Sequence, residues 1–247
     1  MQVKSNWLNT RYENVFAYIA AGIRDGELAP GSRLAGERKI AEQLGLSRDT
    51  VRQGLDLAEQ HGLIVRIPQR GTFVASPKVR QDLGAMQPFG KTVRDLSMEP
   101  TYHLRSRDAV ALDEATAGQL EVDPGSAALE IEVLGLANGL PLALYRSTLP
   151  QWVVDAIGPG VSWGERSSYE LAAAALGLSS LTVSQELEAV TLRGERAQTV
   201  KVRSGAPGFV STSLFRGPDG RPVERRIAWY PGSRYRFRMS RNIRIDP

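Results

Sequence analysis

Side chains that could recognise nucleic acid bases are concentrated in one short stretch, at Arg48, Thr50, Arg52 and Gln53. Arginine can donate two hydrogen bonds to guanine, glutamine can read adenine, and threonine can meet a thymine methyl group or a phosphate. Asp49 lies among them and would repel phosphate, so we expect it to pair with a neighbouring arginine or to accept from a cytosine amino group. This combination of residue types predicts a surface that reads DNA.

The elements around this stretch have the order of a winged helix-turn-helix. They are helices over 9–26, 34–44 and 47–60, a turn at Gly45-Leu46, and two wing strands over 63–67 and 72–74. Ser47 can cap the last helix, whose N-terminal end would enter the major groove. Gln69 and Arg70 at the wing tip are placed to reach a minor groove or the DNA backbone. The alternative, a merely solvated and capped helix start, leaves the surrounding motif unexplained.

Residues 1–75 resemble the DNA-binding domain of the GntR family. The matching residues are Tyr12, the run from Ile23 to Leu34, Glu37-Arg38, Leu46-Ser47-Arg48-Asp49-Thr50-Val51-Arg52, and Arg70-Gly71-Thr72-Phe73-Val74. The resemblance implies DNA contacts from Arg38, Ser47, Arg48, Thr50 and Arg52, and from the wing, where we include Gln69, Arg70 and Gly71.

Three positions depart from the family pattern. Ala35-Gly36 stands where Pro-Ser is usual, Gln69 holds a wing position usually occupied by glycine, and Gly54 replaces alanine in the last helix. The glycine costs about 1 kcal/mol of helix propensity. We expect the first two to alter contacts with the DNA backbone and what the wing reads, and none to prevent folding.

Composition sets outer limits on the class of protein. The 247 residues suffice for two domains, and 42% hydrophobic and 23% charged residues are typical of a soluble globular protein. There is no cysteine, which excludes disulfides and thiolate metal sites. The N-terminal residues show no continuous apolar run of a signal peptide or membrane anchor, so we expect a cytoplasmic protein without membrane contact.

The charge distribution alone does not identify DNA as a partner. The net charge is +4, yet residues 1–76 hold ten Lys/Arg against eight Asp/Glu, whereas residues 221–247 hold eight against two. Phosphate binding depends on the local count of contacts, so the contact residues carry the prediction. Arg234, Arg236 and Arg238 alternate with apolar residues, which favours a strand with one charged face over a second nucleic-acid site.

The second half of the chain predicts an antiparallel sheet with helices on one side, an α+β domain. Asn138-Gly139 is its strongest hairpin signal, and Pro218-Asp219-Gly220 is another. The expected helices are 91–97, 113–120, 151–157 and 167–176, and the expected strands are 128–137, 142–149, 182–192, 209–216, 223–230 and 235–239. We assign 1–76 to the winged domain, 77–90 to a linker and 91–247 to the second domain.

Residues 89–241 resemble the UTRA effector-binding domain of the HutC subfamily. The matching residues are Leu136-Ala137-Asn138-Gly139-Leu140-Pro141, Ser167-Ser168-Tyr169, Asp219-Gly220-Arg221-Pro222-Val223-Glu224, Tyr230 and Arg234-Tyr235-Arg236-Phe237. The resemblance implies a chorismate-lyase-like fold, a homodimer formed largely through this domain, and a small ligand that changes affinity for a double-stranded DNA operator.

The resemblance also implies a set of effector-binding residues. Members that bind sugar phosphates or similar anions usually carry Arg-x-Arg before the hairpin and Glu after it, where this chain has Val133, Gly135 and Tyr145. The positions we assign to the effector are Phe89, Lys91, Thr92, Tyr145, Ser167, Glu224 and Tyr230. A phosphate, phosphonate, sugar derivative or other small metabolite is possible, and loss of both arginines favours a less anionic or more apolar one.

Several alternatives stay open at this point. Lys91, Arg105, Arg107 or Arg146 could replace the lost positive charge. Glu224 could be an ordinary ion pair with a neighbouring arginine, Tyr145 and Tyr230 could be core residues, and Ser167 could be only a helix cap. No metal-ligand spacing, phosphate loop or cofactor motif is present, and only His61 and His103 are histidines. We therefore expect a ligand-responsive transcription regulator rather than a lyase-like enzyme or an architectural DNA-binding protein.

Overall fold

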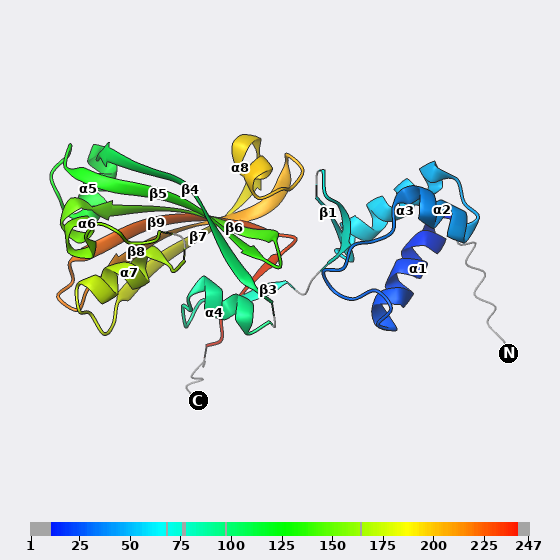
Figure 1. Cartoon of the computed structure of the whole chain (residues 1–247), viewed down its shortest axis with the longest axis horizontal. Coiled ribbons are helices and arrows are strands. Elements are labelled where there is room, and N and C mark those ends of the chain that lie inside the picture. Colours follow the sequence, from blue (N-terminus) through cyan, green and yellow to red (C-terminus); the bar gives the residue numbers. More distant parts are fainter. Residues whose placement is uncertain (1–10, 68, 76–77, 97, 164, 242–247) are drawn as a thin grey trace, which may run out of the picture. The chain divides into compact units, whose positions relative to one another are not determined.

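The computed structural model describes residues 11–67, 69–75, 78–96, 98–163 and 165–241. The chain divides into two compact units, Met1–Lys78 and Val79–Pro247 (Figure 1). No helix in these described ranges is long and apolar enough to cross a membrane.

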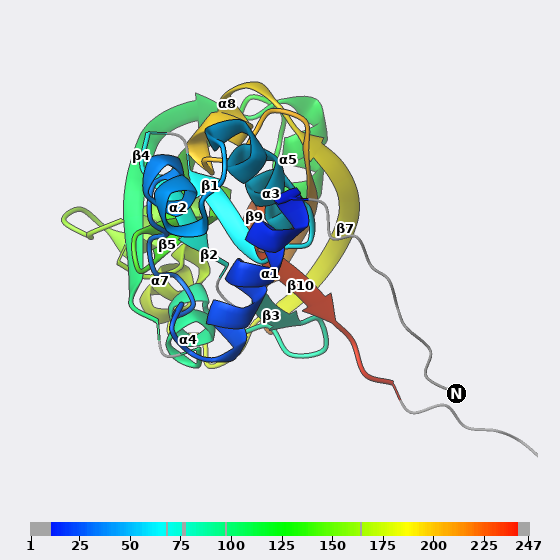
Figure 2. The ribbon, with the colours of Figure 1, turned by 90° about the vertical axis from the view of Figure 1, so that its right-hand side faces the viewer.

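The first unit, here the winged unit, consists of three helices and a two-stranded sheet. In chain order they are α1 (Arg11–Arg24), α2 (Glu37–Leu44), α3 (Arg48–Gln60), β1 (Ile64–Ile67) and β2 (Gly71–Val74). Buried Val15, Ile19, Ile40, Val51 and Leu55 join the helices into one core, and Figure 2 shows the three helices grouped together. The predicted winged helix-turn-helix is confirmed.

Gly54 lies where α1 crosses α3, which explains its departure from the usual alanine. A Cβ at this position would lie 2.5 Å from the carbonyl oxygen of Tyr12 and 2.5 Å from Cβ of Val15. Real Cβ atoms do not approach backbone oxygens this closely, so the two helices can be this near only because the side chain is absent. The cost in helix propensity is offset by the close packing of α1.

The second unit is built on a six-stranded antiparallel sheet with the order β4-β5-β6-β9-β8-β7. Its strands are β4 (Pro100–Ala111), β5 (Ala127–Ala137), β6 (Leu140–Pro150), β7 (Thr182–Leu192), β8 (Ala206–Arg216) and β9 (Pro222–Pro231). A separate parallel pair joins β3 (Val79–Asp82) to β10 (Tyr235–Arg238). Asn138 and Gly139 form the β5–β6 turn with φ angles of 47° and 74°, as the hairpin signal predicts.

Helices cover both faces of this sheet, not one face as the sequence pattern suggests. α4 (Phe89–Arg94), α6 (Gln151–Ile157), α7 (Ser168–Ala175) and the β3–β10 pair pack on one face. α5 (Glu114–Leu120) and α8 (Gly194–Thr199) pack on the other. The reason lies in β5, where Leu134 and Leu136 face α8 while Ile131 faces the opposite core, so both faces need cover.

Three elements lie where the sequence predicts none. β3 lies inside the expected linker of 77–90 and buries Val79 against Tyr235, so the second unit begins at Val79. β4 is an edge strand with most residues exposed, so it lacks the alternation that identifies a strand. α8 is a single short turn of helix that starts at a glycine.

Arg234 departs from the expected strand with a charged face. Arg236 and Arg238 are exposed as expected, but Arg234 is 4% exposed and donates to the carbonyl oxygens of Val200 and Lys201. Burial lowers the pKa of Arg234 to about 10. This guanidinium therefore ties β10 to the end of α8 through backbone carbonyls.

Candidate DNA-reading surface and candidate effector cavity

The start of α3 carries the predicted base-reading side chains on the surface. The Oγ of Ser47 accepts a hydrogen bond from the backbone N–H of Thr50 at 3.2 Å, so the predicted cap is confirmed. The same hydroxyl lies 2.8 Å from Oγ1 of Thr50. Arg48 and Gln53 are exposed and lie on the same first turns. The geometry leaves this end of the helix open to a ligand.

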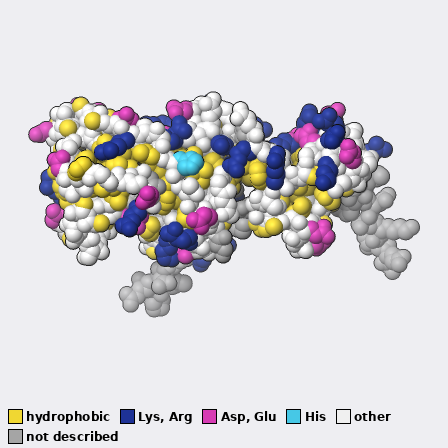
Figure 3. Space-filling model, in the orientation of Figure 1, with side chains coloured by type: hydrophobic (Ala, Val, Ile, Leu, Met, Phe, Trp, Pro, Cys, Tyr) yellow, Lys and Arg dark blue, Asp and Glu magenta, His cyan; other side chains and the backbone are white. Residues whose placement is uncertain are grey.

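Arg52 is held in place by acidic neighbours. Its Nη2 lies 3.2 Å from Glu37 and its Nη1 lies 4.0 Å from Asp49, which gives Asp49 the arginine partner expected from the sequence. Arg38 on α2 similarly lies 3.7 Å from Glu42. Basic and acidic side chains alternate over this unit in Figure 3, so a polyanion would have to draw these arginines away from their carboxylates.

The wing is fixed to α3 at its base and is unusual at its tip. Arg66 on β1 bonds to Asp56 and donates to the carbonyl oxygen of Arg52 at 3.3 Å. At the tip, Gln69 has a φ of 62° and Gly71 a φ of 112°, both in the left-handed region. Gly71 also accommodates the Arg33 side chain, whose Nε would lie 3.1 Å from an added Cβ. Gly71 is therefore required by backbone geometry, whatever its part in DNA contact.

Five of the seven predicted effector residues line one small cavity of the second unit. They are Phe89, Thr92, Tyr145, Ser167 and Tyr230. A neighbouring cavity shares Tyr145, Ser167 and Arg226 with it. We call the two together the tyrosine cavity, because Tyr102, Tyr145, Tyr169, Tyr230 and Tyr235 contribute to its walls.

Lys91 and Glu224 do not line the tyrosine cavity. Lys91 is exposed and pairs with Asp95 at 2.8 Å. Glu224 is fully buried behind the wall, where Oε1 accepts from Arg226 at 2.9 Å and from the hydroxyl of Ser168 at 2.8 Å. The ion-pair alternative for Glu224 is thus what the structure shows.

Arg226 is a cavity-lining residue that the sequence analysis does not assign to the effector. It is 5% exposed, lines both parts of the tyrosine cavity, and donates through Nε and Nη2 to Glu224, Ser147 and Ser168. No bond of Nη1 is found among the described residues. The signal was present, because Arg226 stands two residues after Glu224 on one strand and must share its face.

The arginines proposed as substitutes lie elsewhere. Arg105 and Arg146 both pair with Glu132, at 2.8 and 3.0 Å, on the face that carries α8. Arg107 lies over the ring of Trp163 at 5.8 Å. None of the three lines the tyrosine cavity, so the positive charge there comes from Arg226 and from exposed Arg166 at its rim.

Aromatic rings fill the space that the missing family arginine would occupy. An added Cβ at Gly135 would lie 2.9 Å from the ring of Phe89, so this ring packs directly on the glycine. Phe89 in turn contacts Tyr102 and Tyr145 edge-on, with centroids 5.3 and 5.9 Å apart. Burial raises the pKa of Tyr145 well above its ordinary value, which keeps this hydroxyl protonated.

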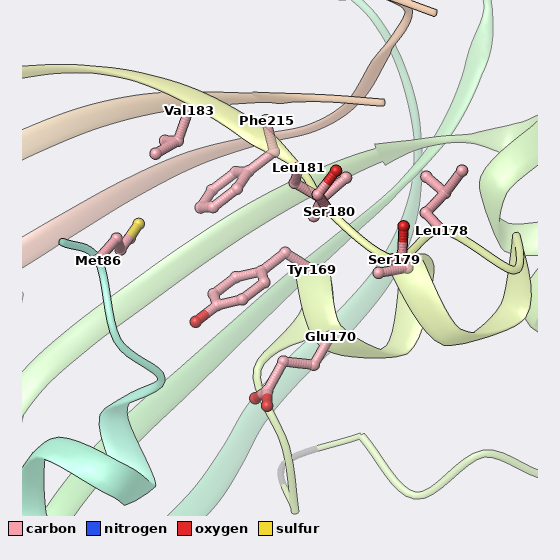
Figure 4. A pocket seen from close by; sticks show the side chains of 10 residues that line it. Met86, Tyr169, Glu170, Leu178, Ser179, Ser180, Leu181, Val183 and Phe215 are labelled. Atoms are coloured by element: carbon pink, nitrogen blue, oxygen red, sulfur yellow. The ribbon is translucent and has the colours of Figure 1, made fainter. Parts of the chain in front are cut away.

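The tyrosine cavity is small, and a larger cavity adjoins it. Each of its two parts has a volume of about 20 Å³, room for about one water molecule. The adjoining cavity, which we call the apolar cavity, measures about 240 Å³ and shares Met86 and Tyr169 with the tyrosine cavity (Figure 4). A metabolite could enter the tyrosine cavity only if its walls moved apart.

Comparison with known families decides the class of the protein. Residues 11–74 match the family model for bacterial regulatory proteins of the gntR family, and residues 95–236 match the UTRA domain. The chain belongs to the GntR family. It is a DNA-binding transcription regulator with a UTRA domain that takes a small-molecule effector, and its relatives are regulators rather than enzymes.

Individual relatives of this GntR regulator cover nearly the whole chain. The HTH-type transcriptional repressor NagR of Bacillus subtilis is 30% identical over 226 residues, 92% of each chain. The histidine utilization repressor of Pseudomonas putida is 26% identical over 92% of this chain and 90% of its own. The crystal structure of PhnF from Mycobacterium smegmatis has a TM-score of 0.64 at 22% identity and covers 95% of this chain and 100% of its own. That likeness confirms the α+β fold of a winged helix followed by a UTRA domain.

Proposed function

We propose that this regulator is a repressor whose effector binds in the tyrosine cavity through Arg226. The observation that carries the proposal is the position of Arg226, a buried guanidinium at the meeting point of five residues assigned to the effector from the sequence. Its Nη1 remains available for an acceptor atom, and a hydrogen bond to a charged group contributes about 1.5–3 kcal/mol. The names of NagR and the histidine utilization repressor support the direction of regulation.

The charges around the tyrosine cavity indicate a weakly charged effector. Arg166 and Arg226 line it, while Glu224 bonds to Arg226, and Glu170 accepts from the backbone N–H of Ser167 at 3.1 Å. The buried guanidinium of Arg226 is already paired with Glu224, and the other nearby cations, Arg166 and Arg94 beside Tyr102, are exposed to water. A doubly charged phosphate would meet no unpaired buried cation, so an uncharged or singly charged polar group fits these walls better.

Ligand entry would act on the first elements of the UTRA domain. Phe89 and Thr92 belong to α4 and Gln81 to β3, and all three line the cavity. Because each part of the cavity holds only about one water molecule, a larger ligand must displace these elements. β3 starts one residue after Lys78, where the winged unit ends. A coupling free energy of about 1–3 kcal/mol through this segment would switch operator occupancy.

The test of the effector site compares two adjacent arginines on β9. Arg226→Lys keeps the charge but loses the planar fork, and we expect about tenfold weaker effector binding in calorimetry, with unchanged operator affinity. Arg225→Lys is the matched control, because Arg225 points to the opposite face and bonds to Gln119. Equal behaviour of the two variants would remove Arg226 from the effector site. Singly charged carboxylates and inorganic phosphate are the first compounds to titrate.

We infer that Arg38, Ser47, Arg48, Thr50, Arg52, Gln53 and the wing residues 69–71 contact the operator. Arg52→Ala should weaken specific binding by about 1–3 kcal/mol in a fluorescence titration at fixed salt. Arg24→Ala is the control, because Arg24 is also exposed and paired with a carboxylate but lies in the last turn of α1. If both variants bind the operator alike, Arg52 does not read bases.

We also propose that the protein acts in the cytoplasm as a homodimer on a pseudo-palindromic operator. Two winged units related by a two-fold axis would match two half-sites related by the same symmetry. Light scattering of the purified protein should give twice the chain mass, and a footprint should protect two inverted half-sites. A monomer that protects a single half-site would contradict the proposal.

A further inference from the structure

The apolar cavity beside the tyrosine cavity has the walls of a hydrocarbon-binding site. Met86, Leu178, Leu181, Val183 and Phe215 line it. In Figure 4 the Phe215 ring lies against the Tyr169 ring, Val183 and Leu181 lie on the Phe215 side, and Met86 lies at one end of the pocket. These side chains are half-buried or buried, so a ligand there would remove apolar surface from water.

The polar groups around this cavity are few and are already occupied or exposed. Glu170 accepts the backbone N–H of Ser167 and so completes the N-terminal cap of α7. Ser179 and Ser180 are exposed at the rim. The Glu170 carboxylate is the one charged group among the described lining residues and would repel an anion, so the walls favour an apolar group over an anionic one.

Tyr169 connects the two cavities. Its ring stacks on Phe215 with centroids 4.8 Å apart, and the guanidinium of Arg226 lies 4.9 Å from the Tyr169 centroid and 5.2 Å from that of Phe215. Tyr169 and Met86 belong to both walls. A ligand group on Arg226 is therefore separated from the apolar cavity by little more than one aromatic ring.

We propose that the effector is amphiphilic, with a compact polar head on Arg226 and an apolar tail that passes Tyr169 and Met86 into the apolar cavity. The inference rests on the proposed head site at Arg226. It accounts for the size of the site, since the head site alone has room for about one water molecule in each part. It also agrees with the pairing of Arg226 with Glu224, because the tail rather than the head supplies most of the affinity.

The experiment is a chain-length series of straight alkanoates, from acetate through butanoate and hexanoate to octanoate, titrated into the full-length protein. Each methylene that enters the apolar cavity should tighten binding about fourfold until the cavity is full. Val183→Phe fills the cavity and should abolish this gain while leaving acetate binding unchanged. Ser184→Phe is the matched control, because Ser184 is exposed on the other face of β7 and should leave the series as in the natural protein.

A second pair of variants keeps the proposal testable if Val183→Phe fails to fold. Ala173 on α7 lines the apolar cavity, whereas its neighbour Ala174 is exposed and lies outside that lining. Ala173→Leu should therefore reduce the gain in affinity per methylene, and Ala174→Leu should leave that gain unchanged. An equal gain per methylene in all variants, or no gain in the natural protein, overturns the tail site. Acetate binding without chain-length dependence rejects the tail alone. No binding of any alkanoate, acetate included, rejects the head site at Arg226 and the tail with it.

Discussion

The winged unit and the UTRA domain assemble their candidate sites in different ways. In the winged unit the residues from Ser47 to Gln53 lie on consecutive turns of one helix, and the wing tip adds a second contiguous group. In the UTRA domain the cavity takes side chains from β3, α4, β6, α7 and β9, and one central hydrogen bond joins Ser168 to Glu224 across 56 positions. A site on one helix can be predicted from the spacing of its residues in the sequence, whereas a site across a sheet depends on which strands pair.

The largest expected effect concerns the buried ion pair of the UTRA domain. Glu224→Ala leaves Arg226 charged, buried and without its carboxylate, so we expect the UTRA domain to lose about 3–5 kcal/mol of stability in a urea titration. Glu132→Ala is the control on the other face of the same sheet. Its partners Arg105 and Arg146 remain partly exposed, so water can solvate them and the expected loss is about 0–1 kcal/mol.

A double variant distinguishes the cost of an unpaired buried charge from the cost of lost side-chain packing. Glu224→Leu together with Arg226→Met replaces the pair by apolar side chains and should recover most of the stability lost in Glu224→Ala. The double variant should nonetheless fail to bind effector, because the only buried guanidinium among the described cavity-lining residues is gone. Effector binding by this double variant would place the ligand elsewhere.

The tyrosines predict how the UTRA domain responds to alkali. Burial is the largest cause of a raised pKa at Tyr145, Tyr230 and Tyr235, and at Tyr169 it raises the pKa to about 12. Below the ordinary tyrosine pKa of 10 both folded and unfolded chains keep the proton, so this contribution to stability is complete. Between pH 10 and about 12 only the unfolded chain ionises at Tyr169, so stability falls as pH rises.

Melting temperature measured against pH tests this expectation. The transition of the UTRA domain should fall steeply above pH 10, while the buried tyrosines of this domain should contribute tyrosinate absorbance only on unfolding. Tyr169→Phe should make the decline shallower without moving its onset, because it removes one of the protons released on unfolding while Tyr145, Tyr230 and Tyr235 still release theirs. A flat melting temperature across this range would show that these hydroxyls ionise in the folded protein.

A smaller effect on stability is expected at Gly54, where helix propensity favours alanine and packing against α1 favours glycine. Gly54→Ala improves helix propensity by about 1 kcal/mol, but the new Cβ would meet the backbone of α1, so we expect a net loss of about 1–3 kcal/mol. Gly118→Ala on α5 is the matched control, because no atom lies within 4 Å of its added Cβ and the residue is exposed. That variant should gain about 0.5–1 kcal/mol in the same denaturant titration. A gain in both variants would mean that α1 moves easily away from α3.

Features decided by neighbouring residues could be predicted from the sequence, and features decided by distant residues could not. Local signals predicted α3 with its Ser47 cap and the Asn138-Gly139 turn, because both are decided within a few residues. The resemblance assigns Ser167 and Tyr230 to the effector, and both line the tyrosine cavity. The remaining contacts of the cavity depend on pairing between strands that are distant in the sequence. Gly135 gives no local sign that Phe89 covers it from 46 positions away, since only the folded sheet brings them together.

The same limit explains the missed charge and the missed edge strand. Arg226 is absent from the predicted effector residues because the sequence suggests it only as an ion-pair partner of Glu224, although alternation on a strand places these two residues on one face. The strand β4 was missed because an edge strand has one neighbour and weak burial, so nothing forces an apolar alternation on its sequence.

The smallest expected effect lies at the wing tip, where a residue with a side chain occupies a backbone conformation that favours glycine. Gln69 has a φ of 62°, a conformation that costs a residue with a side chain about 1–2 kcal/mol and costs glycine little. Gln69→Gly should therefore stabilise the winged unit by about 0.5–1 kcal/mol once the greater entropy of the unfolded glycine is subtracted. If the glutamine is retained for reading DNA, the same variant should bind its operator more weakly despite its greater stability. Unchanged operator affinity in the stabilised variant would leave Gln69 without a part in recognition, and the wing would then contribute through its backbone and Arg70.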